Sequence, residues 1–330
     1  MRVAATRKIP KIAFDLLRNQ GIQIIGGKNA APPSYAQLKK LVRGADAIFS
    51  ELTEKIDKEI ITAAGPHLKI IASYAVGTDN IDVAYARKKG IFVTNTPGVP
   101  TEAVAEHAIA LLFAVARRVV EADRFMRAGK YKYWNPELLV GTELHGKTFG
   151  IVGCGRIGAK TAEIAHAGLG MNIIYSDIAP NPLFEKSTRA THVSLNELLK
   201  TADVISLHAP LIKETRHLIS ASSLKIMKPS AILINTARGA LIDEKALVAA
   251  LKKKRILGAG LDVMEYEPKP TKGLTSLSNV ILTPHIGSAT HDARDAMARI
   301  AAENIIDALS GKIPKNQALY TFNKQSPRVH

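Results

Sequence analysis

The chain has 330 residues, of which 46% are hydrophobic and 22% are charged, and its formal net charge is +16. This composition is typical of a folded globular protein and excludes a disordered or fibrous one. The length predicts two domains, because one domain usually holds ~100 to 200 residues. The single cysteine, Cys154, excludes an intrachain disulfide framework and a thiolate metal cluster. We therefore expect no metal site and a reducing, cytoplasmic location.

The apolar segments give no sign of export or of a membrane partner. The first twenty residues contain no apolar stretch of signal-peptide length. The longest apolar run, AIALLFAVA, is far shorter than the ~20 residues that span a bilayer. We expect a soluble protein that binds no membrane.

The positive charge is a reason to consider nucleic-acid binding, because a basic face attracts phosphates. The basic residues are spread along the chain, however, and the densest run, Lys252 to Arg255, closes a helical pattern. Cations there stabilise the negative end of a helix. We predict no nucleic-acid partner and keep such binding as a third alternative.

In chain order, the first predicted unit is a small α/β domain. Its short apolar runs are VAAT, IQIIG, AIFS, KIIASY and IFVTN, with helical patterns between them. We assign residues 1–98, together with 288–330, to a substrate domain. A long helix follows from about Thr101 to a stop at Gly129, and we expect it to bridge domains or to pack on a second subunit.

The second predicted unit, residues 99–287, is a doubly wound α/β domain. Apolar runs that alternate with helical patterns of about a dozen residues favour a parallel sheet buried on both faces. A final helix is expected from about His291 to Leu309, and a polar tail after it is expected to fray. The six expected strands are Phe149 to Val152, Asn172 to Tyr175, Val204 to Leu207, Ala231 to Ile234, Gly258 to Val263 and Val280 to Leu282.

Gly153, Gly155 and Gly158 form the pattern G-x-G-x-x-G between a predicted strand and a predicted helix. In this context the glycines permit a tight turn, close approach of the backbone to a pyrophosphate, and helix packing. The next strand ends at Asp177, 19 positions beyond Gly158. An acid there accepts ribose hydroxyls and repels a 2'-phosphate, which predicts NAD(H) as the cofactor. The alternative is a glycine-rich turn without a ligand, and we interpret Cys154 as a small filling residue, not a nucleophile.

Polar residues follow the predicted strands, where an open parallel sheet binds its ligands. Arg238 offers a planar cation to the carboxylate and carbonyl of a 2-oxo acid. His285 can exchange a proton with the carbonyl oxygen during hydride transfer, and a neighbouring glutamate would favour its charged imidazolium form. The spacing does not choose between Glu265 and Glu267. Each residue taken singly has a simpler interpretation. Arg238 could form a surface ion pair, and His285 could be a turn residue. His208, in the motif HAP, could belong to a loop that takes no part in the chemistry.

Four motifs, VGCGRIG, NTARGALID, GLDVMEYEP and TPHIGSAT, resemble in order and spacing those of the D-isomer-specific 2-hydroxyacid dehydrogenases. The likeness extends over nearly the whole chain through YAVGTDNID and NTPGVPTEAVAEHAIALL. It implies two Rossmann-like domains, with an NAD-binding doubly wound parallel sheet inserted into a smaller flavodoxin-like substrate domain. It also implies a homodimer served by the helix from Thr101.

The resemblance implies catalytic roles for Arg238, Glu267 and His285, and thereby selects Glu267 over Glu265. The substrate contacts that we expect are Leu52, the backbone of Val76 and Gly77, and Trp134. The residues expected to bind NAD are Gly153, Gly155, Arg156, Ile157, Gly158, Asp177, His208, Pro210, Thr236, Ala237, Asp262 and Gly287.

Within the family, SYAVGTDNID, NTPGV and YWNPELLVG are most similar to the glyoxylate and hydroxypyruvate reductases. That subgroup commonly has W-x-P-x-W, with aromatics that approach the neighbouring subunit's site, whereas here Trp134 and Pro136 are followed by Leu138. We expect an NADH-dependent reductase of glyoxylate or hydroxypyruvate. The phosphoglycerate dehydrogenases are the alternative, ranked second because Glu51 and Leu52 offer a phosphate no cation.

A further alternative comes from another class of protein, because some relatives of this family are transcriptional corepressors that sense the dinucleotide. Those relatives carry disordered extensions. This chain has only a short tail and keeps all three expected catalytic residues, so we rank an enzyme first.

Overall fold

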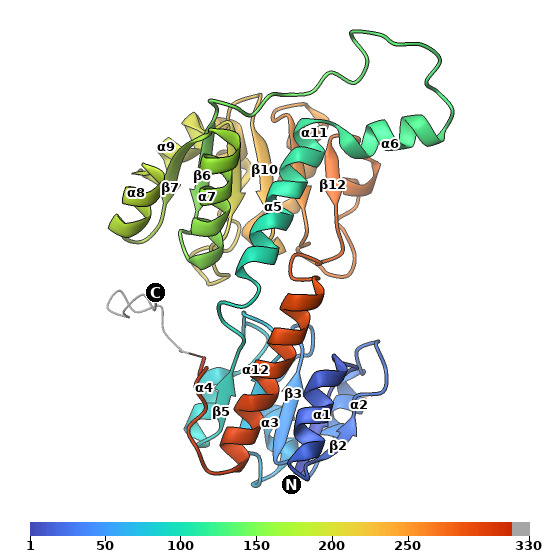
Figure 1. The fold of residues 1–330 in the computed structure, drawn as a ribbon, viewed down its shortest axis with the longest axis vertical. Coiled ribbons are helices and arrows are strands. Elements are labelled where there is room, and N and C mark those ends of the chain that lie inside the picture. The colour runs from blue at the N-terminus through green and yellow to red at the C-terminus, as the bar shows by residue number, and fades with distance from the viewer. Residues whose placement is uncertain (319–330) are drawn as a thin grey trace. The chain divides into compact units, whose positions relative to one another are not determined.

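The computed structural model describes residues 1–318, and the part of the predicted polar tail from residue 319 onward lies outside the described residues. The chain forms two compact units (Figure 1). Among the described residues, unit 1 comprises 1–100 and 289–318, and unit 2 comprises Thr101–Ser288. Over the described part of the chain, no helix combines the length and hydropathy needed to cross a bilayer.

Unit 1 is a five-stranded parallel sheet in the order β2-β1-β3-β4-β5. Side chains of α1 and α12 pack on one face of this sheet, and side chains of α2, α3 and α4 pack on the other. The order is that of a flavodoxin-like fold. The strands are β1 Arg2–Ala5, β2 Gln23–Gly26, β3 Ala47–Ser50, β4 Ile70–Ser73 and β5 Phe92–Thr94; the helices are α1 Lys11–Asn19, α2 Tyr35–Leu41, α3 Lys58–Ala64, α4 Val83–Lys88 and α12 His291–Leu309.

Capping side chains set the starts of several of these helices. Ser34 accepts the Gln37 N–H while the Gln37 side chain accepts the Ser34 N–H, which is a capping box. Asp57 and Thr290 cap α3 and α12 in the same sense, by accepting N–H groups of the first turn. The predicted last helix, His291 to Leu309, is therefore confirmed at both ends.

Unit 2 is a seven-stranded parallel sheet in the order β12-β11-β10-β9-β6-β7-β8. One hydrophobic core lies between the sheet and α5 and α7, and another between the sheet and α9, α10 and α11. The two sheets confirm the predicted fold class. The strands are β6 Thr148–Val152, β7 Asn172–Ser176, β8 Thr191–His192, β9 Val204–Leu207, β10 Ile232–Asn235, β11 Gly258–Leu261 and β12 Val280–Leu282; the helices are α5 Thr101–Ala116, α6 Val119–Arg127, α7 Arg156–Leu169, α8 Pro182–Thr188, α9 Leu195–Thr201, α10 Ala221–Ile226 and α11 Glu244–Lys252.

The prediction of one continuous helix from Thr101 to Gly129 was wrong. Arg118 adopts a left-handed backbone conformation with φ 52°, which separates α5 from α6. The segment that returns from α6 contacts the last residue of α5: the Thr142 N–H donates to the Ala116 carbonyl at 2.7 Å. Gly141 allows this approach, since a Cβ there would lie 2.4 Å from that carbonyl oxygen. Tertiary contact thus overrides a helical pattern that continues in the sequence.

The strand order reverses between β6 and β9, which is the topological switch point where such sheets bind ligands. The loop after β6 turns at Gly153, whose φ is 91°. A Cβ at Gly153 would lie 2.6 Å from the backbone nitrogen of Ala209 in the loop after β9, so only glycine lets the two loops meet. A Cβ at Gly158 would lie 2.2 Å from the Gly153 carbonyl oxygen. The glycine pattern therefore has the packing role predicted for it.

His208 lies directly after β9 at this switch point. Its Nε2 is 2.8 Å from the hydroxyl of the buried Ser206, and its backbone N–H donates to the Val152 carbonyl at 2.8 Å. Burial of the ring lowers the pKa of His208 to about 3, from an ordinary value of 6.5. His208 is therefore neutral at physiological pH.

The neutral ring predicts a pH-dependent stability. The unfolded chain binds a proton at His208 below pH about 6.5, whereas the folded chain does so only near pH 3, so stability is lost as the pH falls between these values. At pH 5 the loss is about 2 kcal/mol in the free energy of unfolding. His208→Gln keeps a hydrogen-bonding group for Ser206 and does not titrate. Denaturant unfolding at pH 7.5 and pH 5 should show a smaller decline for the variant than for the wild type, and equal declines would contradict the assignment.

Candidate active site

Three residues predicted to be catalytic follow three adjacent strands of unit 2. Arg238 follows β10, Glu267 lies in the loop after β11, and His285 follows β12. β11 pairs with β10 on one side and with β12 on the other. Because all three strands are parallel, their carboxyl ends lie along one edge of the sheet. The topology thus collects at one edge residues that are far apart in the sequence.

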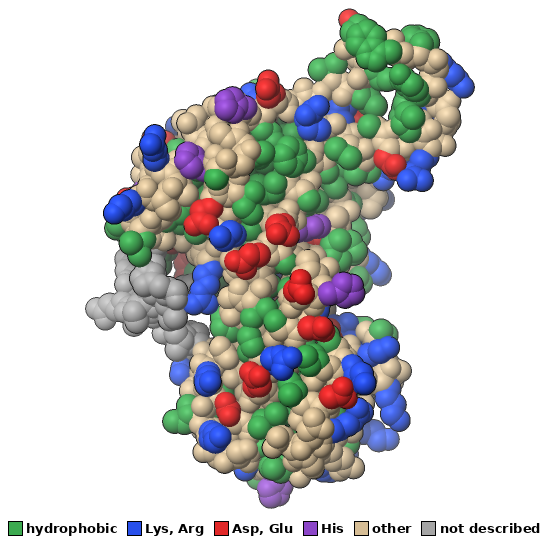
Figure 2. Space-filling view, viewed as in Figure 1, with side chains coloured by type: hydrophobic (Ala, Val, Ile, Leu, Met, Phe, Trp, Pro, Cys, Tyr) green, Lys and Arg blue, Asp and Glu red, His purple; other side chains and the backbone are tan. Residues whose placement is uncertain are grey.

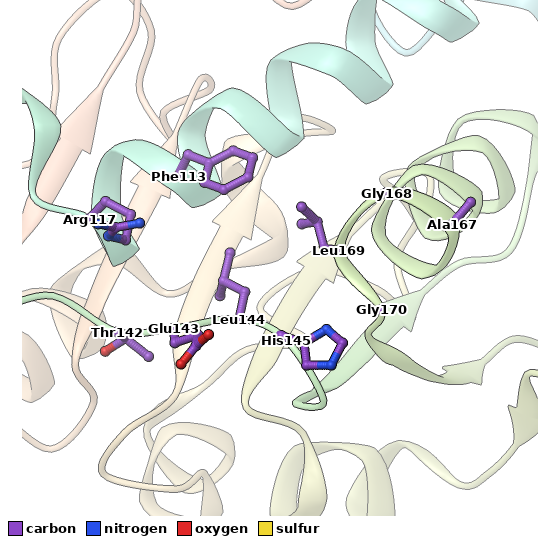
Figure 3. A pocket seen from close by; sticks show the side chains of 10 residues that line it. All are labelled: Phe113, Arg117, Thr142, Glu143, Leu144, His145, Ala167, Gly168, Leu169 and Gly170. Carbon is purple, nitrogen blue, oxygen red and sulfur yellow. The ribbon is translucent and has the colours of Figure 1, made fainter.

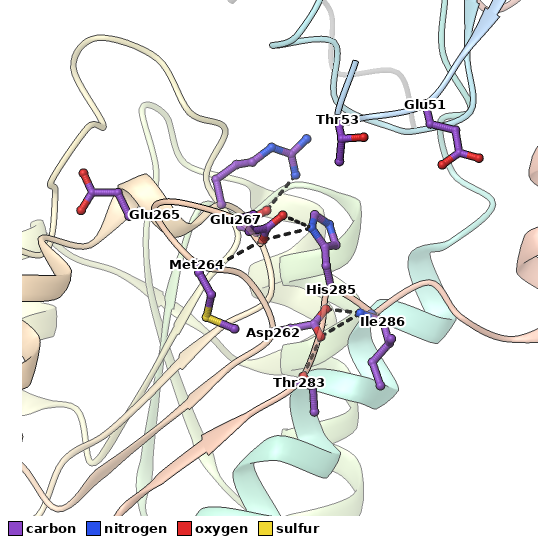
Figure 4. Close-up of polar contacts among 12 residues, drawn as sticks. Glu51, Thr53, Asp262, Met264, Glu265, Glu267, Thr283, His285 and Ile286 are labelled. Carbon is purple, nitrogen blue, oxygen red and sulfur yellow. Dashed lines mark hydrogen bonds and ion pairs between the residues drawn. The ribbon is translucent and has the colours of Figure 1, made fainter. Parts of the chain in front are cut away.

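Glu267 and His285 point toward each other (Figure 4). The His285 Nδ1 lies 3.0 Å from Oε2 and 3.2 Å from Oε1 of Glu267, and Oε1 also accepts the Met264 N–H at 3.1 Å. An ionised carboxylate only accepts hydrogen bonds, so Nδ1 carries a proton. Glu267 thereby fixes the ring through Nδ1, and proton exchange at Nε2 remains a prediction.

Glu265, which the spacing alone did not exclude, has different partners. Its Oε1 accepts the His217 Nε2–H at 2.7 Å and an Arg216 N–H at 3.0 Å, and its side chain is 3% exposed. Its backbone N–H donates to the Glu244 carboxylate at 2.8 Å. The structure therefore places Glu267, not Glu265, against His285.

Arg238 leaves β10 in an extended conformation. Its carbonyl accepts the Asn235 side-chain amide at 2.9 Å, and its Nη1 donates to the Ala237 carbonyl at 2.7 Å. The next residue, Gly239, lies against the loop after β11, because a Cβ there would be 1.9 Å from the Met264 carbonyl carbon. The loop of Arg238 and the loop of Glu267 are therefore packed backbone to backbone.

Asp262, at the end of β11, holds the loop that carries His285 (Figure 4). Its carboxylate accepts the Thr283 hydroxyl at 2.6 Å and the N–H groups of Ile286 and Gly287 at 2.9 and 2.7 Å. Its carbonyl accepts the His285 N–H at 2.8 Å. Burial alone would raise the pKa of the Asp262 carboxyl, but hydrogen bonds from two side chains and two backbone amides hold it below its ordinary value. The contact of Asp262 with NAD remains a prediction.

His107 belongs to this site and was missed in the sequence. It lies on α5, and its Nε2 is 3.0 Å from Thr283 Oγ1 and 3.3 Å from Asp262 Oδ1. The available signal was a single histidine, His107, directly before the apolar stretch AIALL. Without knowing which strand end α5 crosses, that signal does not indicate a partner.

The loop after β6 fits a dinucleotide. α7 begins at Arg156 with Gly155 as its N-cap and no side-chain cap, and a Cβ at Gly155 would meet no described atom within 4 Å. The open N-terminus of a 14-residue helix suits a pyrophosphate. Asp177, at the end of β7, accepts the Cys154 N–H at 2.8 Å and the Ile178 N–H at 2.6 Å. Its carboxylate is thereby fixed beside the glycine loop, and Cys154 is the buried filling residue that we expected.

The other residues predicted to bind NAD lie at neighbouring strand ends. Thr236, directly after β10, has a buried hydroxyl with no hydrogen-bond partner among the described residues, which suits a group brought by a ligand. Ala237 is adjacent, Gly287 is buried in the loop held by Asp262, and Pro210 follows β9 with His208. In residues 1–318, no group of three or more His, Cys, Asp and Glu side chains is arranged to hold a metal ion.

The residues predicted to bind the substrate lie in other segments. Leu52 follows β3 of unit 1, and Val76 and Gly77 form the loop after β4, where the Val76 carbonyl accepts the Asn95 side-chain amide at 2.6 Å. Trp134 lies in unit 2, in the segment after α6, and is 75% exposed. Their contacts with a substrate remain predictions.

Comparison with known proteins identifies the family. The sequence profile described as "D-isomer specific 2-hydroxyacid dehydrogenase, NAD binding domain" matches residues 109–287. A glyoxylate reductase of Thermococcus litoralis is 50% identical over 319 residues, which is 96% of this chain and 96% of that protein.

Two solved structures extend the likeness to the fold. A Thermus thermophilus protein has a TM-score of 0.91 and 46% identity, covering 97% of this chain and all of that one (100%). An NADPH-dependent glyoxylate/hydroxypyruvate reductase of Sinorhizobium meliloti, in complex with NADP and malonate, has a TM-score of 0.83 and 30% identity, covering 96% of each chain. The predicted family is confirmed: the chain belongs to the D-isomer specific 2-hydroxyacid dehydrogenases and is an NAD-dependent oxidoreductase.

Proposed function

We propose that the protein reduces a small 2-oxo acid, glyoxylate or hydroxypyruvate, reversibly to the D-2-hydroxy acid with NADH. The observation that carries this proposal is the pair His285 and Glu267 at a strand edge shared with Arg238, in the unit that also contains the glycine loop. The Thermococcus litoralis relative is named a glyoxylate reductase, and the Sinorhizobium meliloti relative acts on glyoxylate and hydroxypyruvate by its name.

The residues divide the chemistry as follows. When bound, NADH supplies the hydride that reduces the carbonyl carbon. His285 gives a proton from Nε2 to the carbonyl oxygen and removes it in the oxidation. Glu267 orients the ring by accepting a hydrogen bond from its Nδ1–H. Arg238 binds the substrate carboxylate and carbonyl as a planar cation.

The cofactor is assigned to residues 99–287. The glycine loop and the N-terminus of α7 would hold the pyrophosphate, and Asp177 would accept the ribose hydroxyls and repel a 2'-phosphate. Residues 1–98 and 288–330 are assigned to the substrate domain, where the backbone of Val76 and Gly77 would bind the substrate carboxylate. We place the reaction in the cytoplasm, because a chain with a single cysteine, Cys154, has no intrachain disulfide that would suit an oxidising compartment.

D-3-phosphoglycerate remains the second candidate substrate, because the cation that unit 1 contains near the turn at Leu52, Arg7, is already paired with carboxylates. The Arg7 guanidinium lies 2.7 Å from the Glu54 carboxylate and 3.2 Å from the Glu51 carboxylate. Burial raises the pKa of Glu51, although Arg7 opposes this effect. Two carboxylates thus surround the arginine, which disfavours a phosphate dianion there.

The exposed segment after α5 supports a homodimer. α6 buries none of its residues, and Tyr133 and Trp134 are 72% and 75% exposed. Figure 1 shows α6 and the following loop extending away from the sheet of unit 2, and Figure 2 shows apolar side chains gathered on this extension. Contiguous exposed apolar side chains mark interaction sites. A second copy of the chain is the occupant that we propose.

A groove at the base of this extension offers a complementary surface. It measures about 520 Å³ and lies at the carboxyl-terminal ends of α5 and α7 (Figure 3). Phe113 and Leu169 give it apolar walls, and Arg117, Glu143 and His145 give it a polar rim. This mixture is typical of protein interfaces, which combine an apolar centre with a polar rim.

Substrate and cofactor preference test the proposed function directly. NADH oxidation is measured from the nicotinamide absorbance with four acids: glyoxylate, hydroxypyruvate, phosphohydroxypyruvate and pyruvate. We expect it to be fastest with glyoxylate or hydroxypyruvate. NADPH should be at least about 10-fold less effective, because Asp177 repels its phosphate. Preference for phosphohydroxypyruvate would instead favour the phosphoglycerate reaction. Silence on every acid would favour a dinucleotide-sensing interaction protein.

His285→Ala should lower kcat by about 10²- to 10⁴-fold, since it removes the proton donor. The Kd of NADH, measured by fluorescence quenching, should change little because the histidine acts in the transition state. His67→Ala, in an exposed loop of unit 1, is the matched control and should keep full activity. A His285→Ala enzyme with nearly wild-type kcat would exclude the assigned role.

The extension should determine the oligomeric state. Tyr133→Ser with Trp134→Ser removes two large exposed aromatic groups and should shift the mass measured by light scattering from dimer toward monomer. Leu183→Ser with Ile313→Ser, which changes two residues that are 64% and 72% exposed elsewhere, should leave the mass unchanged. A wild-type monomer, or an aromatic double variant that remains fully dimeric, would rule out this interface.

A further inference from the structure

His107 is a half-buried imidazole that contacts the active-site loop from a helix. Its Nε2 lies between Thr283 Oγ1, at 3.0 Å, and Asp262 Oδ1, at 3.3 Å. The side chain is 17% exposed, and that of Asp262 is 1% exposed. His107 Nε2 thus lies in ion-pairing distance of the Asp262 carboxylate.

The proton positions follow from the distances. The Thr283 hydroxyl donates to Asp262 Oδ1 at 2.6 Å, so its single proton is used there. The Thr283 oxygen can then only accept a hydrogen bond from His107. The His107 Nε2 therefore carries a proton, which it shares between the threonine oxygen and the carboxylate.

The same carboxylate determines the backbone of residues 283–287. His285 adopts a left-handed conformation with φ 56°, which costs free energy for a residue that has a Cβ. The neighbouring amides of Ile286 and Gly287 are both directed at the Asp262 carboxylate, at 2.9 and 2.7 Å. Keeping this buried carboxylate in place is what keeps His285 in that conformation.

Helix α5 is a rigid support for His107. It packs against β10, β11, β12 and α7, and most of its apolar side chains are buried. Its Val104 lies 3.6 Å from the position of a Cβ on Gly287, and Leu111 lies 3.0 Å from that of a Cβ on Gly260 of β11. A hydrogen bond from α5 therefore ties the loop to the core of unit 2.

We propose that His107 is a positioning residue for the acid/base histidine: its Nε2–H holds Asp262 and Thr283, and through them the left-handed turn at His285. This inference rests on the proposed function, because it gives His107 a role only through the chemistry of His285. In this proposal His107 contacts neither His285 Nε2 nor the substrate carbonyl oxygen, the two atoms that exchange the proton. Its effect should appear in the chemical step rather than in cofactor affinity.

Two substitutions separate the hydrogen bond from the bulk of the side chain. His107→Leu removes the N–H but keeps an apolar volume, whereas His107→Gln retains an N–H at about the position of Nε2. His166→Leu is the matched control, because His166 is also a half-buried helical histidine of unit 2 with one hydrogen bond, at 3.1 Å to the Met171 carbonyl. It lies on α7, which packs against β6 and β7, whereas residues 283–287 follow β12 at the edge of the sheet.

We expect His107→Leu to lower kcat by about 10- to 100-fold, since small displacements of a reacting group have effects of this size. The Kd of NADH should stay within about 3-fold of the wild-type value, and His107→Gln should recover most of kcat. His166→Leu should keep kcat. A loss shared equally by the Leu and Gln variants, or a His107→Leu enzyme with wild-type kcat, would overturn the proposal.

Amide hydrogen exchange gives a measurement that needs no turnover. The N–H groups of Ile286 and Gly287 should exchange about 10-fold or more faster in His107→Leu than in the wild type, and should be restored in His107→Gln. If the wild type turns over no 2-oxo acid but these amides still respond, the proposed function fails while the positioning of the loop stands. Unchanged exchange in His107→Leu would refute the positioning itself.

Discussion

The buried carboxylate of Asp262 is the constraint on which the active-site loop depends. A left-handed backbone at a residue such as His285 costs about 1 to 3 kcal/mol. Hydrogen bonds to a charged group contribute about 1.5 to 3 kcal/mol each, and this carboxylate receives two backbone amides and a hydroxyl from the same loop. The charge-assisted contacts therefore outweigh the strain, provided that the carboxylate stays ionised, and those contacts are what keep its pKa low.

A parallel sheet makes this arrangement possible. β10, β11 and β12 end at one edge, so Arg238, Glu267 and His285 meet without any local sequence relation among them. The glycine loop after β6 uses the same edge nearer the switch point, where Gly153 permits contact with the loop after β9. One edge thus presents both the glycine loop and the pair formed by His285 and Glu267. The fold alone does not choose the substrate.

The sequence predicted what depends on local pattern and missed what depends on tertiary contact. Buried apolar runs located the strands of both sheets, but Thr191–His192, a two-residue edge strand, carries too little pattern to detect. The helix from Thr101 was predicted too long, because the break at Arg118 is imposed by the returning segment around Thr142 and not by a breaking residue. His107 was missed for the same reason, since its partners come from another strand end.

The choice between the two glutamates shows how environment assigns roles to similar groups. Glu265 is almost fully buried and is occupied by Arg216 and His217, so its charge is neutralised within its own network. Glu267 is more exposed, and its carboxylate accepts hydrogen bonds from the Met264 amide and from the imidazole of His285. Asp262 holds the backbone of the histidine, and Glu267 holds its ring. The two constraints act on different atoms of His285, so its backbone and the Nδ1 side of its ring are each held by a separate acidic residue.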